Sequence, residues 1–254
     1  MHIFTGFEVN FLDVGQGDGI AIRTHDAFIT VDGGSSDVKN VGKYRIIPFI
    51  KYKGIRAIDY AIISHLDNDH VSGVRELLEQ SDNGGIKVRN IVLPKLLNKD
   101  DEYVEMEKLA HAMGVEVLYL KNGDSIEAGP LKIKCINPDI KNQMDDRNDN
   151  STVLDVKYKN FSMLLTGDIS SEVENNIEKN LAQKYTVLKV PHHGSRFSSS
   201  EKLLSKVSPK YSVISCGEGN SYGHPHIETI YRLNMHNTEI LRTDLIGEID
   251  FRME

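Results

Sequence analysis

Short apolar segments alternate with amphipathic segments along most of the chain. Segments that are rich in apolar and β-branched residues and bounded by Gly and Asp turns predict strands. Segments in which apolar residues recur every three to four positions predict helices with one buried face. In the first half, strands are predicted at residues 7–14, 19–24, 27–31 and 58–64, and helices at residues 71–80 and 102–113.

The second half of the chain shows the same alternation. Strands are predicted at residues 131–136, 153–158, 161–166, 186–190, 211–215, 239–242 and 248–251, and helices at 170–180, 199–207 and 227–235. Each half begins with strands and then alternates strands with helices. This order favours an α/β (α+β) protein of two sheets packed face to face, with helices outside. Residues 137–150 form one long polar insertion, which is expected to be functional or mobile.

The composition is that of an ordinary globular protein, and a single domain over residues 1–254 is predicted. Hydrophobic residues make up 39% of the 254 residues, which excludes intrinsic disorder. The two cysteines, Cys135 and Cys216, are too few for a disulfide scaffold. The net charge of −7 argues against charge-driven coating of nucleic acid, although it leaves room for a local basic groove.

Neither membrane insertion nor secretion is expected from the sequence. The apolar runs are far shorter than the roughly 20 residues needed to cross a bilayer. The first residues lack a basic segment followed by a long apolar core, which a signal peptide requires. The predicted location is therefore the cytoplasm.

Four candidate metal ligands occur within six residues, directly after the apolar segment 58–63. They are His65, Asp67, Asp69 and His70. Ligand sites of α/β proteins lie at the carboxyl ends of strands, and charged groups this close are costly to bring together without a cation. The alternative is a polar turn in which Asp69 caps the following helix, but capping requires only one such residue.

Further candidate ligands follow other predicted strands. Asp168 comes directly after one strand, and the paired histidines His192 and His193 follow another. His224 lies in a fourth polar segment, between a strand and a helix. Taken singly, a Gly-Asp turn is often structural, and a histidine pair is often packed or solvated. Taken together, these donors suffice for two metal ions about 3.5–4 Å apart, an arrangement that activates water.

The segment HLDNDH at residues 65–70 resembles the HxHxDH motif of the metallo-β-lactamase superfamily, with Asp in place of the second His. Further segments resemble, in order, those of the metallo-β-lactamase-like domain of ComEC-type competence proteins. They are FLDVGQGD (11–18), VDGG (31–34), NSTV (150–153), LLTGDI (164–169), LKVPHHGS (188–195), ISCG (214–217) and YGHP (222–225). The resemblance spans nearly the entire chain, and it implies an αββα sandwich with a metal site on one edge of the two sheets.

The resemblance also implies how two divalent ions would be held. The implied ligands are His65 and Asp67 for the first ion, Asp69 and His70 with His193 or His192 for the second, and Asp168 bridging both. The superfamily usually supplies a further histidine where this chain has Asn148, Asp149, Asn150 and Ser151. The first ion is therefore expected to be weakly held. The oxygen-rich donor set also shifts the preference from zinc towards Mn²⁺ or Mg²⁺.

By the same resemblance, the chain is expected to be a metal-dependent hydrolase of phosphodiesters, with DNA as the leading substrate. A hydroxide held by the ions would attack phosphorus, with Asp69 and Asp168 as the catalytic carboxylates. Substrate contacts are expected from Lys189, Ser195, Arg196 and His224. The chain has ten tyrosines, eight phenylalanines and no tryptophan, so no base-stacking platform is evident.

Two other functions remain open at this point. The same fold serves small-substrate phosphodiesterases of the phosphocholine-esterase type. The chain could also be a non-catalytic binding module, although such a module has no need for so many buried charges. β-Lactam or thioester hydrolysis is less favoured, because a carboxylate-rich site suits phosphoryl groups. The sequence indicates no protein partner and no oligomeric state.

Overall fold

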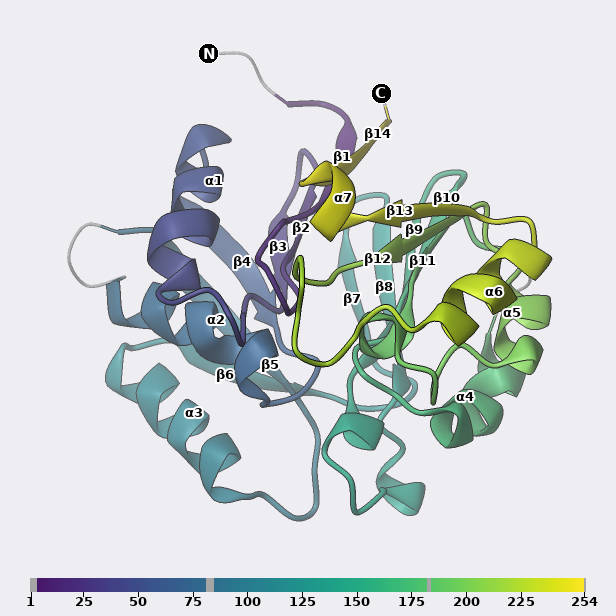
Figure 1. The fold of residues 1–254 in the computed structure, drawn as a ribbon. Coiled ribbons are helices and arrows are strands. Elements are labelled where there is room, and N and C mark those ends of the chain that lie inside the picture. Colours follow the sequence, from purple (N-terminus) through teal and green to yellow (C-terminus); the bar gives the residue numbers. More distant parts are fainter. Residues whose placement is uncertain (1–3, 81–84, 182–183, 254) are drawn as a thin grey trace.

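The computed structural model describes residues 4–80, 85–181 and 184–253. Two seven-stranded sheets pack face to face, and helices cover the outer face of each sheet (Figure 1). The predicted sandwich is therefore confirmed. Among the described residues, no helix has both the length and the hydropathy that crossing a bilayer would need.

The first sheet has the strand order β14-β1-β2-β3-β4-β5-β6. Its strands are β1 (Phe7–Phe11), β2 (Ile20–Arg23), β3 (Phe28–Val31), β4 (Ala57–Ile62), β5 (Lys87–Pro94), β6 (Glu116–Leu120) and β14 (Ile249–Met253). Strands β14, β1, β2 and β3 are antiparallel neighbours, whereas β3 to β6 run parallel. The carboxyl ends of the parallel strands therefore meet at one edge.

The second sheet has the strand order β13-β12-β11-β10-β9-β8-β7. Its strands are β7 (Ser125–Ala128), β8 (Leu131–Asn137), β9 (Val153–Tyr158), β10 (Phe161–Leu165), β11 (Val187–Lys189), β12 (Tyr211–Ile214) and β13 (Glu239–Arg242). Strands β7 to β10 form an antiparallel meander, and β10 to β13 are parallel. Each sheet thus combines an antiparallel half with a parallel half.

The helices divide between the two outer faces. The helices are α1 (Ile47–Tyr52), α2 (Asn68–Gln80), α3 (Asp101–Ala112), α4 (Ser171–Ile177), α5 (Glu201–Val207), α6 (Ile227–Met235) and α7 (Thr243–Ile246). Figure 1 shows α1, α2 and α3 beside the first sheet, with α4, α5 and α6 on the opposite side of the molecule. The apolar stripe of α2, with Val74 and Leu77, packs on the first sheet, as the helical spacing predicts.

The layer between the sheets is apolar and aromatic. Phe7 of β1 stacks on Tyr158 of β9 with ring centroids 4.8 Å apart, and it also packs on Phe161 of β10. A fully buried side chain of this size stabilises the fold by about 1.5–3 kcal/mol through area removed from water. This core fixes the two sheets against each other and so fixes the loops at their shared edge.

Five of these helices and strands were not among the sequence predictions. They are the helices α1 and α7 and the strands β5, β6 and β7. Strand β5 begins with exposed Lys87 and Arg89 and becomes continuously buried only from Ile91, so its apolar run alone is short. The helix α2 begins at Asn68, three residues before the predicted start, which places Asp69 and His70 in its first turn.

Candidate metal centre

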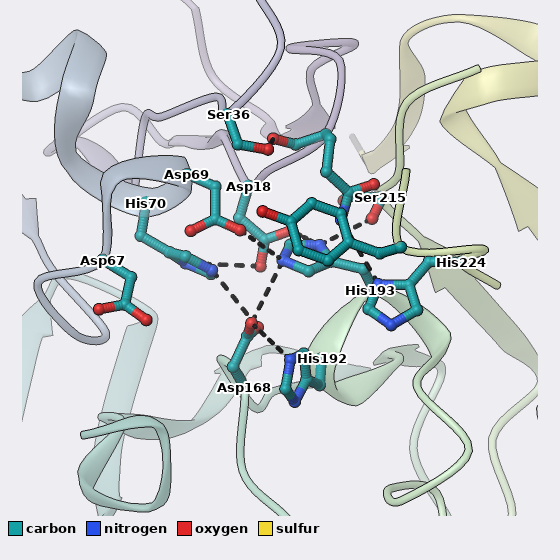
Figure 2. Close-up of polar contacts among 12 residues, drawn as sticks. Asp18, Ser36, Asp67, Asp69, His70, Asp168, His192, His193, Ser215 and His224 are labelled. Carbon is teal, nitrogen blue, oxygen red and sulfur yellow. Dashed lines mark hydrogen bonds and ion pairs between the residues drawn. The ribbon is translucent and has the colours of Figure 1, made fainter. Parts of the chain in front are cut away.

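Four side chains that were predicted as metal ligands converge between the two sheets (Figure 2). One donor atom from each lies within 4.8 Å of the others, and the side chains are those of Asp69, His70, Asp168 and His193. The Nε2 atom of His193 lies 3.2 Å from Asp168 Oδ2 and 3.5 Å from Asp69 Oδ2. Asp69 and His70 come from the first turn of α2, which follows β4, whereas Asp168 follows β10 and His193 follows β11. The centre therefore draws on both sheets.

Several donor atoms of the centre are buried without a hydrogen-bond partner. Among the described residues these include Nε2 of His65, His70 and His193 and Oδ1 of Asp168. An unpaired buried polar atom normally costs about 1–3 kcal/mol, so a cluster of four in one place is unfavourable by itself. Imidazole nitrogen and carboxylate oxygen are the atoms that bind Zn²⁺ and Mn²⁺ in proteins. The residues present therefore fit a divalent cation.

Asp32 at the end of β3 orients His70. One carboxylate oxygen of Asp32 accepts the Ser64 backbone N–H at 2.7 Å, and the other accepts the His70 Nδ1 proton at 3.0 Å. With Nδ1 engaged in this way, His70 directs Nε2 towards Asp168, 3.4 Å away. A carboxylate behind a ligating histidine fixes the tautomer and the orientation of the ring.

The loop that carries Asp69 and His70 is held by backbone contacts with the loops after β1 and β3. Asp18 N–H donates to the Asp69 carbonyl at 3.0 Å, and Gly33 N–H donates to the His70 carbonyl at 2.8 Å. A Cβ on Gly34 would lie only 2.5 Å from the backbone of Asp69 and His70. Gly34 is therefore required by this close approach of two chains.

The turn that carries Asp168 depends on Gly167 and Ser151. Gly167 has φ +53°, and a Cβ there would meet the Ser151 side chain at 2.7 Å. The Ser151 hydroxyl accepts the Asp168 backbone N–H at 3.2 Å and lies 3.3 Å from His65 Nδ1. Ser151 thus links the turn of the second sheet to the histidine loop of the first.

The structure distinguishes the two adjacent histidines. Both have left-handed backbone angles, with φ of 50° at His192 and 52° at His193. The Nδ1–H of His193 donates to the Ser215 carbonyl at 2.9 Å, which leaves Nε2 facing Asp168. His192 Nε2 lies 3.7 Å from Asp168 Oδ2, and its side chain is 32% exposed. His193 therefore joins the four-donor cluster, and His192 lies at its rim.

The charges of the four donors are strongly coupled. Burial acts to lower the pKa of His193, but the Asp168 carboxylate raises it to about 10. Asp168 and Asp32 likewise raise the pKa of His70 against the effect of burial. Burial acts to raise the pKa of Asp69, while the nearby His193 ring and the charge of His70 lower it to about 2. Without a cation, protons on the two histidines balance the charge of the carboxylates.

His65 and Asp67 lie beside this cluster in a different setting. His65 Nε2 is 3.7 Å from Asp67 Oδ2, and burial together with the neighbouring His70 lowers the pKa of His65 to about 3. The other oxygen of Asp67 accepts a 2.7 Å hydrogen bond from Arg147, which also pairs with Asp100 at 2.8 Å. A guanidinium group thus occupies the neighbourhood in which the first ion is expected.

The segment 148–151 supplies few free donors to that neighbourhood. Asp149 accepts the Ser170 N–H, and Asn150 is bonded to the backbone of Met144. Asn148 Oδ1 is buried and has no hydrogen-bond partner. Within the described chain, no third carboxylate, histidine or cysteine groups with His65 and Asp67. This half of the centre is therefore poorer in donors than the other half.

Two of the predicted substrate contacts, Lys189 and Ser195, are buried. Lys189 is fully buried, and its ammonium pairs with Asp18 at 2.7 Å. Its position in β11 explains this, because side chains alternate along a strand and Lys189 shares the inter-sheet side with Val187. Ser195 is also buried, and its hydroxyl accepts the Phe197 N–H.

Two other predicted substrate contacts lie near the surface. Arg196 is exposed and pairs loosely with Glu228 at 3.4 Å. The His224 ring lies 5.6 Å from the His192 ring and 6.2 Å from the His193 ring, between centroids. Burial and the charges of His193 and His192 lower the pKa of His224 to about 4, so that it is neutral at pH 7.

The sequence analysis assigned no role to Asp18, Asp32, Ser151 or Arg147. Asp18 and Asp32 lie in segments that carry the family resemblance, and Asp32 directly follows a predicted strand. A carboxylate directly after a predicted strand is the signal that identified Asp168, and the same signal could have identified Asp32. Arg147 lies in the polar insertion 137–150, and its pairing with Asp67 is visible only in three dimensions.

Comparison with known proteins agrees with the geometry of the fold and the centre. Residues 12–218 match the sequence profile of the metallo-β-lactamase superfamily. The chain belongs to this superfamily. Among solved structures, this chain is similar to YhfI of Bacillus subtilis, with a TM-score of 0.66 and 11% identity over 97% of this chain and all of that one. It is also similar to CmlA of Streptomyces venezuelae, a diiron β-hydroxylase, with a TM-score of 0.59, 12% identity and coverage of 98% and 54%. At these identities the likeness concerns the fold alone.

Curated relatives of this member of the metallo-β-lactamase superfamily include competence and recombination proteins. It is 31% identical to ComE operon protein 3 of Bacillus subtilis, over 96% of this chain and 33% of that protein. It is 31% identical to competence protein ComA of Neisseria gonorrhoeae, over 96% and 32%. Recombination protein 2 of Haemophilus influenzae is 29% identical, over 96% and 28%. The chain spans about a third of the length of these relatives, and the ComEC-type resemblance is confirmed.

Proposed function

We propose that the chain is a metal-dependent hydrolase that cleaves the phosphodiester bonds of DNA. The observation that carries the proposal is the convergence of Asp69, His70, Asp168 and His193, whose donor atoms include buried ones without hydrogen-bond partners. The competence and recombination proteins to which the chain is similar support DNA as the substrate. The cluster supports hydrolysis, because dinuclear sites with carboxylate and imidazole ligands are common in phosphoryl transfer.

In this proposal, the four-donor cluster holds one divalent cation, Zn²⁺ or Mn²⁺, with Mg²⁺ as a further candidate. A second cation, which corresponds to the first ion of the family pattern, would be held by His65 and Asp67, and Asp168 would be the ligand that the two positions share. When bound, such cations neutralise charge on phosphoryl oxygens and increase the acidity of water. The exchange of a histidine for oxygen donors favours Mn²⁺ over Zn²⁺ at the second position.

Other residues would orient the ligands, accept a proton and contact the phosphate. Asp32 holds His70, and the Ser215 carbonyl holds His193, so both rings are oriented before substrate arrives. Asp69 is the most exposed member of the four, with 20% of its side chain accessible, while the others are nearly fully buried. Asp69 is therefore the carboxylate placed to accept a proton from the attacking water. His192 and Arg196 lie at the rim, where they would contact phosphate oxygens.

Two competing functions make different demands on the same centre. A small-substrate phosphodiesterase would use the identical donors but would not hydrolyse a polymer. A non-catalytic binding module would have no use for the cluster, whose charges are costly to bury unless they are balanced. The hydrogen bonds at Nδ1 of His70 and His193 orient the two rings but leave both Nε2 atoms without a hydrogen-bond partner. This arrangement favours the hydrolase.

The proposal is tested by measuring bound metal and hydrolysis together. The protein is purified without chelator, its metal content is determined by elemental analysis, and plasmid DNA and bis-p-nitrophenyl phosphate are offered with Mn²⁺, Mg²⁺ or Zn²⁺. We expect metal-dependent cleavage of both substrates, and loss of it in Asp69→Ala and His70→Ala. His111→Ala, at an exposed position of α3, serves as the matched histidine control and retains full activity.

Each alternative outcome has a separate meaning. Cleavage of the small diester without cleavage of DNA would assign the small-substrate function. Protein that binds no metal and hydrolyses neither substrate would overturn the hydrolase and leave the binding module. Circular dichroism of the two variants shows whether a loss of activity reflects the centre or the fold.

A further inference from the structure

We propose that Tyr222, backed by His224, forms a stacking platform for the nucleobase attached to the phosphate at the metal centre. This inference rests on the proposed function, because it names the part of a nucleotide that the mouth of the centre would bind. It goes beyond the sequence, in which no base-stacking platform is evident.

The aromatic rings form a row that leads outward from the centre. The His224 ring lies 6.2 Å from the His193 ring at an interplanar angle of 28°. The Tyr222 ring lies 5.8 Å from the His224 ring at 19°, so the planes are nearly parallel along the row. His193 belongs to the four-donor cluster, and Tyr222 at the outer end is 55% exposed. The row thus connects the reacting centre to an exposed aromatic face.

The loop between β12 and α6 presents this face rigidly. The Asn220 side-chain amide donates to the Gly217 carbonyl at 2.9 Å and to the His224 carbonyl at 2.6 Å. Its oxygen accepts the backbone N–H of Tyr222 at 3.2 Å and that of His224 at 3.0 Å. One half-buried amide therefore makes four bonds within the loop. Because the backbone that carries the ring is already positioned, less conformational entropy is lost when a ligand stacks on the ring.

The aromatic row and the adjacent cation-binding donors fit a ligand that has a planar, uncharged ring near a phosphate. Aromatic side chains stack on nucleobases in a way that tolerates any sequence, because every base has a π-face. The inner end of the row lies at the cation-binding donors, where a phosphodiester would be held. A group that reaches Tyr222 from there must be attached to that phosphate, and in a nucleic acid that group is the nucleoside. An unpaired base is required, since a paired base has no free face except at the end of a duplex.

The test compares two esters that share one leaving group. Thymidine 5′-(p-nitrophenyl phosphate) carries a nucleobase, whereas methyl p-nitrophenyl phosphate does not. For Tyr222→Leu we expect KM for the thymidine ester to rise on the order of tenfold, because the stacking surface is lost. KM for the methyl ester and the metal content stay unchanged. Tyr222→Phe keeps the ring and should behave as wild type, and Tyr52→Leu, at an exposed tyrosine of α1, controls for loss of a surface aromatic.

The outcomes separate this inference from the proposed function. Equal KM values for the thymidine ester in wild type and Tyr222→Leu, with hydrolysis intact, would overturn the platform and leave the hydrolase in place. Hydrolysis of neither ester by wild type would overturn the proposed function. The platform is then judged by binding of a fluorescein-labelled oligothymidylate in Mn²⁺. Affinity lowered on the order of tenfold in Tyr222→Leu supports it, and absent or equal binding overturns it.

Discussion

Asp69 and Asp67 lie two residues apart at the start of α2, yet their carboxylates have different surroundings. Asp69 faces His193 at 3.5 Å and belongs to a cluster of four donors. Asp67 is bound instead by Arg147 at 2.7 Å, and His65 is its neighbouring donor at 3.7 Å. This segment therefore serves two positions that the chain supplies unequally.

The difference concerns the source of positive charge in each position. In the four-donor half, two histidines with raised pKa values, His70 and His193, carry protons that a cation would displace. In the other half, His65 is neutral and Arg147 supplies a charge that no change of pH removes. A proton is easily exchanged for a metal ion, but a guanidinium group has to move aside. We therefore expect the two positions to fill in sequence, with the four-donor position first.

The largest effect is expected from a matched pair of substitutions. Asp69→Asn removes one of the four donors and should lower both bound metal and kcat/KM, the latter by roughly a thousandfold. Asp67→Asn leaves the four-donor cluster intact and should retain the tightly bound ion, with a loss of about tenfold. Elemental analysis and diester hydrolysis of both variants measure the contrast. Equal losses would show that the two positions are equivalent.

Chelation should reveal the same contrast in stability. A cation present at about 100 times its Kd stabilises the native protein by about 2.7 kcal/mol. In a protein of this size, 1 kcal/mol changes Tm by roughly 2–4 °C, so chelator should lower the Tm of the wild type by roughly 5–10 °C. Asp67→Asn should keep most of this shift and Asp69→Asn should lose it, as measured by differential scanning calorimetry. A full shift in Asp69→Asn would place the tight ion elsewhere.

A smaller effect is expected from Arg147→Met, which removes the competing cation and keeps the apolar stem. An ion pair this exposed contributes about 0.2–1 kcal/mol, so the Mn²⁺ concentration for half-maximal occupancy of the second position should fall about two- to fivefold. Isothermal titration calorimetry measures this directly, without turnover. If Arg147→Met instead needs more Mn²⁺ for half-maximal occupancy, then Arg147 holds the Asp67 carboxylate in the orientation that binds the ion.

The smallest effect is expected from Asp100→Asn. The Asp100 side chain holds Arg147 through one oxygen and caps α3 by accepting the Tyr103 N–H through the other. Asparagine caps helices as well as aspartate, so the helix should be unaffected. With its second partner neutralised, Arg147 pairs more fully with Asp67, and Mn²⁺ affinity should fall by less than about twofold. A change in the same direction as Arg147→Met would contradict this account.

The sequence predicts the donors of the centre better than it predicts their surroundings. Asp69, His70 and Asp168 follow apolar strands directly, and the position of a strand end is a local property of the sequence. The choice between His192 and His193 depends on left-handed backbone angles at both residues, which no local pattern encodes. The role of Arg147 depends on a contact with Asp67, 80 residues away in the chain.

The fold shows the same division between local and distant information. Strands with continuous or alternating apolar residues, such as β4 and β9, are confirmed close to their predicted bounds. Strand β5 is missed although it lies between β4 and β6 in the sheet, because its first half carries charges and its apolar half is short. The burial of Lys189 was missed for a related reason. A strand in the middle of a sheet buries both faces, and a lysine there needs a partner such as Asp18 from another loop.

The pairing of β14 with β1 has a consequence for the order of synthesis on the ribosome. Phe7 pairs with Met253, so one edge of β1 is completed only by a strand that lies far along the chain. When β14 emerges, the residues of the metal centre have long been translated, while Phe7, Val9 and Phe11 still border an open edge. An unpaired edge strand templates association with other chains. The nascent protein is therefore exposed to aggregation at β1 until β14 has been translated.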